Sequence, residues 1–131
     1  MTEWIWINLP EVLAIHARQL ADHGGASGVR DQGLLESALA RPQQKFAYDT
    51  PNLADLSTAY TSGIVRNHPF VDGNKRTGFV VGILFLEING ATFGATETDA
   101  AQTVIDFAAG NCDDEFYARW LEGNITLRDQ G

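Results

Sequence analysis

The fold of this chain is decided by one apolar stretch near its middle, TGFVVGILFLEI, residues 77–88, in which Glu87 is the only charged residue. Asn89-Gly90 follows it, and such a pair is typical of a helix C-terminus. A helix that is apolar on nearly every side lies inside a bundle, because no face of it favours water. It is also shorter than the about 20 apolar residues that a bilayer-spanning helix needs. The stretch therefore predicts a central helix that other helices surround.

Capping residues and helical spacing of apolar residues predict five further helices around this stretch. They run from Pro10 to Gly24-Gly25, from Asp31 to Arg41-Pro42, from Asn52 to near Asn67, from Thr96 to Gly110-Asn111, and from Asp113 onward. The second is expected to end at Arg41-Pro42, because the residue before a proline is pushed out of the helical region. The sequence therefore predicts an all-α bundle of about six helices with short loops.

Two of these helices carry apolar stripes that we expect to face the core. The stripes consist of Leu9, Leu13, His16 and Leu20 in the first helix and of Phe116, Trp120 and Leu121 in the last. His16 lies on or beside its stripe, and we interpret it as a histidine at the edge of the core, with a functional role as the alternative. Residues 43–51 show no clear period and are predicted to form a loop.

Composition indicates one globular domain spanning residues 1–131, with 44% hydrophobic and 20% charged residues. The net charge of −8 argues against a nucleic-acid surface, which normally shows a basic patch, and against binding to an anionic membrane. Cys112 is the only cysteine, so no intrachain disulfide is possible. The first residues lack a charged leader followed by a long apolar region, so we expect a cytoplasmic protein.

The segment directly before the apolar stretch, HPFVDGNKR at residues 68–76, has the residues needed to bind a nucleotide and activate a hydroxyl. His68 is a potential base, since histidine is the side chain that most often serves as one in catalysis. Asp72 is an oxygen ligand suited to magnesium, which proteins hold by one or two carboxylates plus substrate phosphates. Gly73-Asn74 supplies a turn, and Asn74 can cap the helix. Lys75 and Arg76 place positive charge on the first helical turn, where the helix dipole disfavours it unless an anion is bound.

Each of these residues alone is typical of an ordinary capped turn. Their combination within one short segment favours a functional site. The segment also resembles the Fic/Doc signature, His-x-Phe-x-Asp/Glu-Gly/Ala-Asn-x-Arg. The resemblance continues in Gly24-Gly25, in residues 29–43 and in residues 85–90, so it covers most of the chain.

One position separates two activities within this family. Adenylylating members usually have glycine between the Asn and the Arg, and a further Arg three residues later. Here those positions hold Lys75 and Phe79. Members of the death-on-curing (Doc) branch share the lysine, and the resemblance implies that they bind ATP in the reversed orientation, with the terminal phosphoryl group facing the acceptor.

The resemblance implies a role for each motif residue. His68 would be the general base, Asp72 would hold Mg²⁺, and Phe70 would anchor the loop in the core. The phosphates of ATP would be bound by Gly73, Asn74, Lys75 and Arg76. The family resemblance also places residues 43–51 near the mouth of the active site, which makes Phe46 and Tyr48 a candidate target-binding flap; the alternative is that these aromatics merely cover the core.

The resemblance implies a toxin of a toxin–antitoxin system, a kinase that phosphorylates a hydroxyl on elongation factor Tu and so arrests translation. Its co-substrate would be ATP, its metal cofactor Mg²⁺, and its partner an antitoxin of the prevent-host-death type. Two alternatives stay open. One is AMP transfer to a protein hydroxyl, and the other is a Fic-fold binding module without catalysis, which the intact His68, Asp72, Asn74 and Arg76 argue against.

Overall fold

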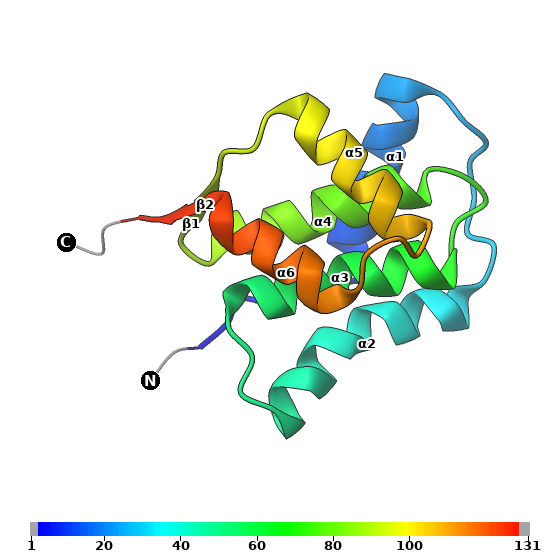
Figure 1. Cartoon of the computed structure of the whole chain (residues 1–131). Helices are drawn as coiled ribbons and strands as arrows, with labels where there is room; N and C mark the ends of the chain where they lie inside the picture. Colours follow the sequence, from blue (N-terminus) through cyan, green and yellow to red (C-terminus); the bar gives the residue numbers. More distant parts are fainter. Residues whose placement is uncertain (1–2, 129–131) are drawn as a thin grey trace.

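The computed structural model describes residues 3–128, and within them six helices form a bundle with one small sheet (Figure 1). The elements are α1 (Leu9–His23), α2 (Gln32–Tyr48), α3 (Leu53–Asn67), α4 (Asn74–Ile88), β1 (Ala91–Phe93), α5 (Glu97–Ala108), α6 (Asp114–Gly123) and β2 (Ile125–Leu127). The predicted all-α bundle is confirmed. The antiparallel β1–β2 pair was not predicted, because strands of three residues are too short to show an alternating pattern.

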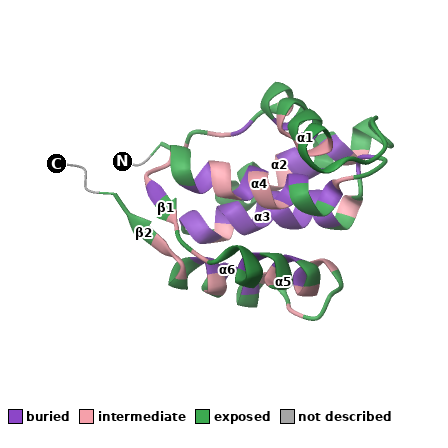
Figure 2. Cartoon of the chain, turned by 90° about the horizontal axis from the view of Figure 1, so that it is seen from above, coloured by how far each residue is buried: buried purple, intermediate pink, exposed green. Residues whose placement is uncertain are grey.

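Helices α3 and α4 share the centre of the bundle. Figure 2 shows the buried residues gathered on them, with α1 on one side and α5 and α6 on the other. The apolar stretch is thus central, as predicted, but α3 is buried on more sides: of Leu53 to Val65, only Asp55 is not buried. Among the described residues, no helix is both long enough and apolar enough to cross a membrane.

Small residues and hydroxyl groups bring α3 and α4 close together. Ser57 Oγ donates to the Gly82 carbonyl and Thr61 Oγ1 to the Gly78 carbonyl, each at 2.8 Å. A Cβ atom on Gly78 would lie 3.1 Å from Val65 Cγ2, and one on Gly82 would overlap the Thr61 hydroxyl. Polar side chains of α3 therefore face the core. For this reason the pattern of apolar residues in the sequence underestimates how much of α3 is buried.

The predicted end of the second helix at Arg41-Pro42 is wrong, since α2 continues through Pro42 to Tyr48. Pro42 lies on the buried face of α2, at helical spacing from Leu35, Ala38 and Leu39. A proline inside a helix removes one backbone hydrogen bond. Burial of this face against α3 offsets that loss, and local sequence rules do not include such packing.

The predicted loop at residues 43–51 is therefore mostly helix, and it lies far from the motif. Phe46 and Tyr48 are on the last turns of α2, beside the start of α3. The motif follows the other end of α3, about 22 Å away at 1.5 Å per helical residue (Figure 1). Phe46 packs edge-on against Trp6, whereas Tyr48 is 91% exposed. The expected placement of these two residues at the mouth of the active site is thus wrong.

Two predicted apolar stripes differ in detail from the buried faces. In α1 the buried residues are Val12 and His16, while Leu13 is exposed. In α6 they are Tyr117, Ala118 and Leu121, while Phe116 is exposed. His16 and Leu121 are buried as predicted, whereas Val12 replaces Leu13 and Tyr117 replaces Phe116 on the buried faces. Helical spacing alone does not resolve such neighbouring positions.

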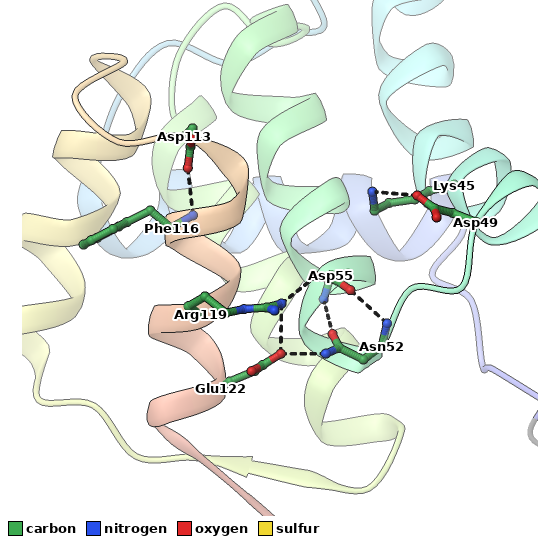
Figure 3. Close-up of polar contacts among 8 residues, drawn as sticks. All are labelled: Lys45, Asp49, Asn52, Asp55, Asp113, Phe116, Arg119 and Glu122. Atoms are coloured by element: carbon green, nitrogen blue, oxygen red, sulfur yellow. Dashed lines mark hydrogen bonds and ion pairs between the residues drawn. The ribbon is translucent and has the colours of Figure 1, made fainter.

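Polar side chains fix α6 to the start of α3 (Figure 3). The Arg119 guanidinium lies 2.8 Å from Asp55 Oδ1 and 2.9 Å from Glu122 Oε1. Asn52, the N-cap of α3, also donates to Glu122. This network holds the end of the bundle opposite the motif, so it supports the fold and takes no direct part in the site.

Candidate active site

The motif loop, residues 68–73, connects α3 to α4. Helix α3 ends because His68 adopts a left-handed backbone conformation, with φ 49° and ψ 55°, and Pro69 follows it. His68 is the only non-glycine residue with positive φ among the described residues. Such a conformation costs about 1–3 kcal/mol and persists only where neighbouring contacts enforce it. The side chain of His68 is exposed at the surface of the loop.

Arg30, between α1 and α2, enforces this conformation. Its Nε donates to the His68 carbonyl at 2.7 Å, and its terminal nitrogen donates to the Asn67 carbonyl at 2.9 Å. The Arg30 backbone N–H donates to the Pro69 carbonyl, and Val29 forms an antiparallel bridge with Phe70. A planar guanidinium suits this two-point contact with adjacent carbonyls. The sequence reasoning gave Arg30 no role, although it lies within the segment that resembles the family.

Asn74 stabilises the loop through hydrogen bonds to the backbone of Phe70. Its Oδ1 accepts from the Phe70 N–H and its Nδ2 donates to the Phe70 carbonyl, both at 3.0 Å. The prediction that Asn74 caps α4 is wrong, because Gly73 is the N-cap and Asn74 is the first helical residue. Phe70 is 1% exposed and its ring stacks on His16. Together these contacts hold the backbone between His68 and α4 in one conformation.

Backbone amides orient the Asp72 carboxylate. Oδ1 accepts from the Gly73 N–H at 2.9 Å and Oδ2 from the Ala26 N–H at 3.3 Å. Asp72 remains exposed, and each carboxylate oxygen has a second lone pair for another ligand. Gly25 makes this approach possible, since a Cβ there would lie 2.8 Å from Asp72 Oδ2. The carboxylate is thus pre-oriented at the surface of the site.

The N-terminus of α4 has features that suit an anion. The other helices from α2 to α6 begin with a side chain that accepts a first-turn N–H, from Asp31, Asn52, Thr96 and Asp113. Helix α4 begins with Gly73 and has no such side chain. The first N–H groups of a helix without a side-chain cap remain available to a bound anion.

Lys75 and Arg76 add two cations that have no partner in the described chain. Arg18, Arg41, Lys45, Arg66 and Arg119 lie within 4.0 Å of a carboxylate, and Arg30 and Arg128 donate to backbone carbonyls. Only Lys75 and Arg76, among the described residues, make no such contact. Their position at a helix N-terminus is electrostatically unfavourable until an anion neutralises it. A phosphate-bearing ligand would satisfy both the cations and the free N–H groups.

The described residues contain no cluster of three His, Cys, Asp or Glu side chains that could hold a metal by themselves. Asp72 is the carboxylate beside the anion site, and its two oxygens are already oriented. One carboxylate plus ligand phosphates is the usual arrangement for Mg²⁺. The residues present therefore fit a magnesium ion that binds together with a nucleotide.

Two cavities lie away from the motif loop and suit a nucleotide less well. One, of about 700 Å³, is found where α2, α3 and α6 meet, and its cations Arg41, Lys45 and Arg119 are already paired with carboxylates. The other, of about 600 Å³ between α5 and α6, has three aspartates in its lining, which repel phosphate. The chemistry thus favours the open surface of the motif loop over either hollow.

Comparison with known proteins agrees with this geometry. The model of the Fic/DOC family matches residues 6–86, which is more than half of the chain. The chain belongs to the Fic/Doc family. It is similar to a protein named Toxin Doc from Mycolicibacterium smegmatis, with 40% identity over 112 residues that cover 82% of this chain and 86% of the relative. It is also similar to a protein named Protein kinase doc from Escherichia phage P1, with 35% identity over 85 residues, 64% of this chain and 68% of the relative.

The part of the chain that matches the Fic/Doc family contains α1 to α3, the motif loop and most of α4. It therefore includes the contacts of Arg30, Asn74 and Asp72 that shape the site. The helices α5 and α6 lie outside the match and contribute no residue to the motif loop contacts described above.

Proposed function

We propose that this Fic/Doc protein is a toxin that transfers the γ-phosphoryl group of ATP to a hydroxyl of elongation factor Tu. The observation that carries the proposal is the pair of unpartnered cations, Lys75 and Arg76, on the uncapped first turn of α4. His68 and Asp72 lie in the loop that leads into that turn. The names of the two relatives, a toxin and a protein kinase, support both parts of the proposal.

In this mechanism the phosphates of ATP lie against Gly73 and Asn74 at the N-terminus of α4. They bind the free N–H groups of its first turn and the side chains of Lys75 and Arg76. Asp72 holds Mg²⁺, which when bound neutralises phosphate charge and orients the nucleotide. His68 takes the proton from the acceptor hydroxyl. The oxygen then forms a bond to the γ-phosphorus, the bond to the β-phosphate oxygen breaks, and ADP leaves. The fixed backbone of the loop keeps His68 and Asp72 in place during transfer.

Lys75 supports γ-phosphoryl rather than AMP transfer. A glycine at this position would leave backbone space for phosphate, whereas the lysine side chain occupies that space and adds charge. Kinase chemistry needs the γ-phosphate beside His68, and AMP transfer needs the α-phosphate there. One orientation of the nucleotide cannot satisfy both.

The proposal includes a partner and a location. A toxin must be neutralised in the cell that makes it, so we propose a cognate antitoxin of the prevent-host-death type. Its protein target and its ATP are in the cytoplasm, and we place the protein there. Neither Phe46 nor Tyr48 is part of the catalytic step, since both lie at the other end of α3 from His68; contact with the target protein remains a proposed role for them.

A labelling experiment tests the proposal. The purified protein is incubated with elongation factor Tu, Mg²⁺ and ATP that carries its label in the α- or in the γ-phosphate. Only the γ-label should appear on the acceptor. His68→Ala should lower the rate by about 10² to 10⁴-fold, the usual effect of removing a general base. His23→Ala, which removes an exposed histidine from the last turn of α1, is the matched control and should keep the full rate.

Transfer of the α-label by the unmutated protein would instead establish AMP transfer. Absence of both labels from elongation factor Tu, with transfer to another protein in a cell extract, would retain the chemistry and replace the acceptor. Nearly full activity in His68→Ala would remove His68 as the base.

A further inference from the structure

His16 on α1 contacts the motif loop, although it precedes His68 by 52 positions in the sequence. We propose that His16 is a positioning residue that fixes Asp72 for the magnesium–nucleotide complex. The proposal rests on the proposed function, in which Asp72 is the metal ligand. His16 touches no reacting atom itself, and it acts through the backbone of Asp72.

The contact is a partly buried hydrogen bond. His16 is 6% exposed, and its Nε2 lies 2.8 Å from the backbone oxygen of Asp72. A carbonyl oxygen only accepts, so Nε2 must carry the proton and donate. Because a buried donor left without its acceptor is unfavourable, the bond is a strong constraint on the loop.

The same ring also lies against two other residues of the loop, Phe70 and Gly73. It stacks on Phe70 with ring centroids 3.8 Å apart and an angle of 8° between the planes. A Cβ atom on Gly73 would lie 3.7 Å from His16 Nε2. An aliphatic side chain could fill this space, but it could not donate to the Asp72 carbonyl. The packing therefore explains why a flat ring occupies this position. Only the hydrogen bond explains why that ring is the imidazole of a histidine.

The hydrogen bond reaches the carboxylate through one rigid unit. The Asp72 carbonyl and the Gly73 N–H belong to the same planar peptide group. His16 donates to the oxygen of that peptide group. The N–H of the same group, that of Gly73, donates to Asp72 Oδ1 at 2.9 Å. If the peptide plane rotates, the carboxylate loses the donor that orients it. His16 thus controls the direction in which Asp72 presents its oxygens.

Two substitutions separate the hydrogen bond from the stacking. His16→Phe keeps a ring that can stack on Phe70 and removes the donor. His16→Gln keeps an N–H donor of similar reach and removes the ring. His23→Phe, at an exposed position of the same helix, is the matched control. If His16→Phe does not fold, His16→Leu replaces it as the variant without a donor.

Two measurements are made on each folded variant. Amide hydrogen exchange at Gly73 in the nucleotide-free protein reports the peptide group directly. Mg²⁺ affinity in the presence of a non-hydrolysable ATP analogue reports the metal ligand. We expect His16→Phe to exchange faster at Gly73 and to lose about 10-fold in Mg²⁺ affinity, the lower end of the usual effect of losing an outer partner of a metal ligand. His16→Gln should recover much of both.

The proposal is overturned if Gly73 exchange is unchanged in His16→Phe, or if exchange changes while Mg²⁺ affinity does not. Equal impairment of His16→Gln and His16→Phe at equal melting temperature would show that the donor is not what matters, and would also overturn it. If the unmutated protein binds no magnesium–nucleotide complex, the proposed function fails, and the link from His16 to metal binding fails with it. Gly73 exchange would then decide separately whether His16 holds the loop.

Discussion

At the scale of single residues, the site depends on contacts between the motif loop and a segment that precedes it by about forty residues in the sequence. Gly25, Ala26 and Arg30 lie against the loop and orient Asp72 and His68 through backbone groups. Gly25 is the clearest case, because any side chain there would displace the Asp72 carboxylate.

We expect Gly25→Ala to weaken nucleotide-dependent Mg²⁺ binding. Its Cβ would lie 2.8 Å from Asp72 Oδ2, so the carboxylate has to move. Gly24→Ala is the matched control: Gly24 also has a positive φ, of 80°, but a Cβ there meets nothing within 4 Å. Both variants therefore carry backbone strain, and only Gly25→Ala disturbs Asp72. Titration of Mg²⁺ in the presence of an ATP analogue measures the difference. Equal Mg²⁺ affinities of the two variants would show that the position of the Asp72 carboxylate does not affect metal binding.

Lys75 is the residue on which the choice between two transfer reactions rests. We expect Lys75→Gly to lose most γ-phosphoryl transfer, because the cation on the first turn of α4 is removed and space for phosphate opens. Full conversion to AMP transfer is not expected, because Phe79 stands where adenylylating relatives have a further Arg. Mass spectrometry of the acceptor distinguishes the two adducts. Lys45→Gly, which removes the chain's other lysine at the far end of α2, is the control and should transfer normally. Unchanged transfer by Lys75→Gly would contradict a phosphate-binding role.

At the scale of the elements, the α3–α4 contact places the site. Helix α3 ends at His68 and α4 begins after Gly73, so the distance between these helices sets the span of the motif loop. Close approach depends on Gly78 and Gly82 of α4, which receive hydrogen bonds from Thr61 and Ser57. Side chains at these glycines would push the helices apart.

We expect Gly82→Ala to destabilise the fold by about 1–3 kcal/mol, the usual cost of overpacking a core. The added Cβ would overlap the Thr61 hydroxyl and lie 3.1 Å from Ser57 Oγ. Gly123→Ala, in α6, is the control, since a Cβ there meets nothing within 4 Å. Chemical denaturation of both variants measures the free energy of unfolding. Equal stability of the two variants would show that α3 and α4 adjust easily.

At the scale of the whole molecule, the bundle has a marked charge asymmetry. The chain carries a net charge of −8, yet its only two unpartnered Lys and Arg side chains within the described residues lie together at one helix end. The overall charge disfavours non-specific binding to nucleic acid, while the local charge favours a phosphate. This charge distribution agrees with the proposed toxin, which would bind the phosphates of a nucleotide and act on another protein.

We expect expression of this chain alone to arrest bacterial growth. Co-expression of its cognate antitoxin should restore growth, because the antitoxin neutralises the toxin. His68→Ala should be harmless although it accumulates as folded protein. Growth curves, with the amount of folded protein measured in the same cultures, test this expectation. Normal growth of cells that contain abundant folded wild-type protein would contradict the toxin function and leave the transferase chemistry untested by this experiment.

The sequence by itself determined the all-α class, the central position of residues 77–88, the caps of α2, α3, α5 and α6, and the motif segment. These features are local: apolar periodicity and capping depend on residues within a few positions of one another. The family follows from the same short segments, because their residue order is specific.

Only the tertiary structure decided how the motif is held. Arg30 and His16 contact the loop across 38 and 56 residues, and no local pattern reports such contacts. The passage of α2 through Pro42 and the burial of the hydroxyl-rich α3 are further cases, since packing against neighbouring helices overrides local propensity there. The sequence thus names the reactive groups, and long-range packing sets their orientation, because orientation depends on residues that meet only in the folded chain.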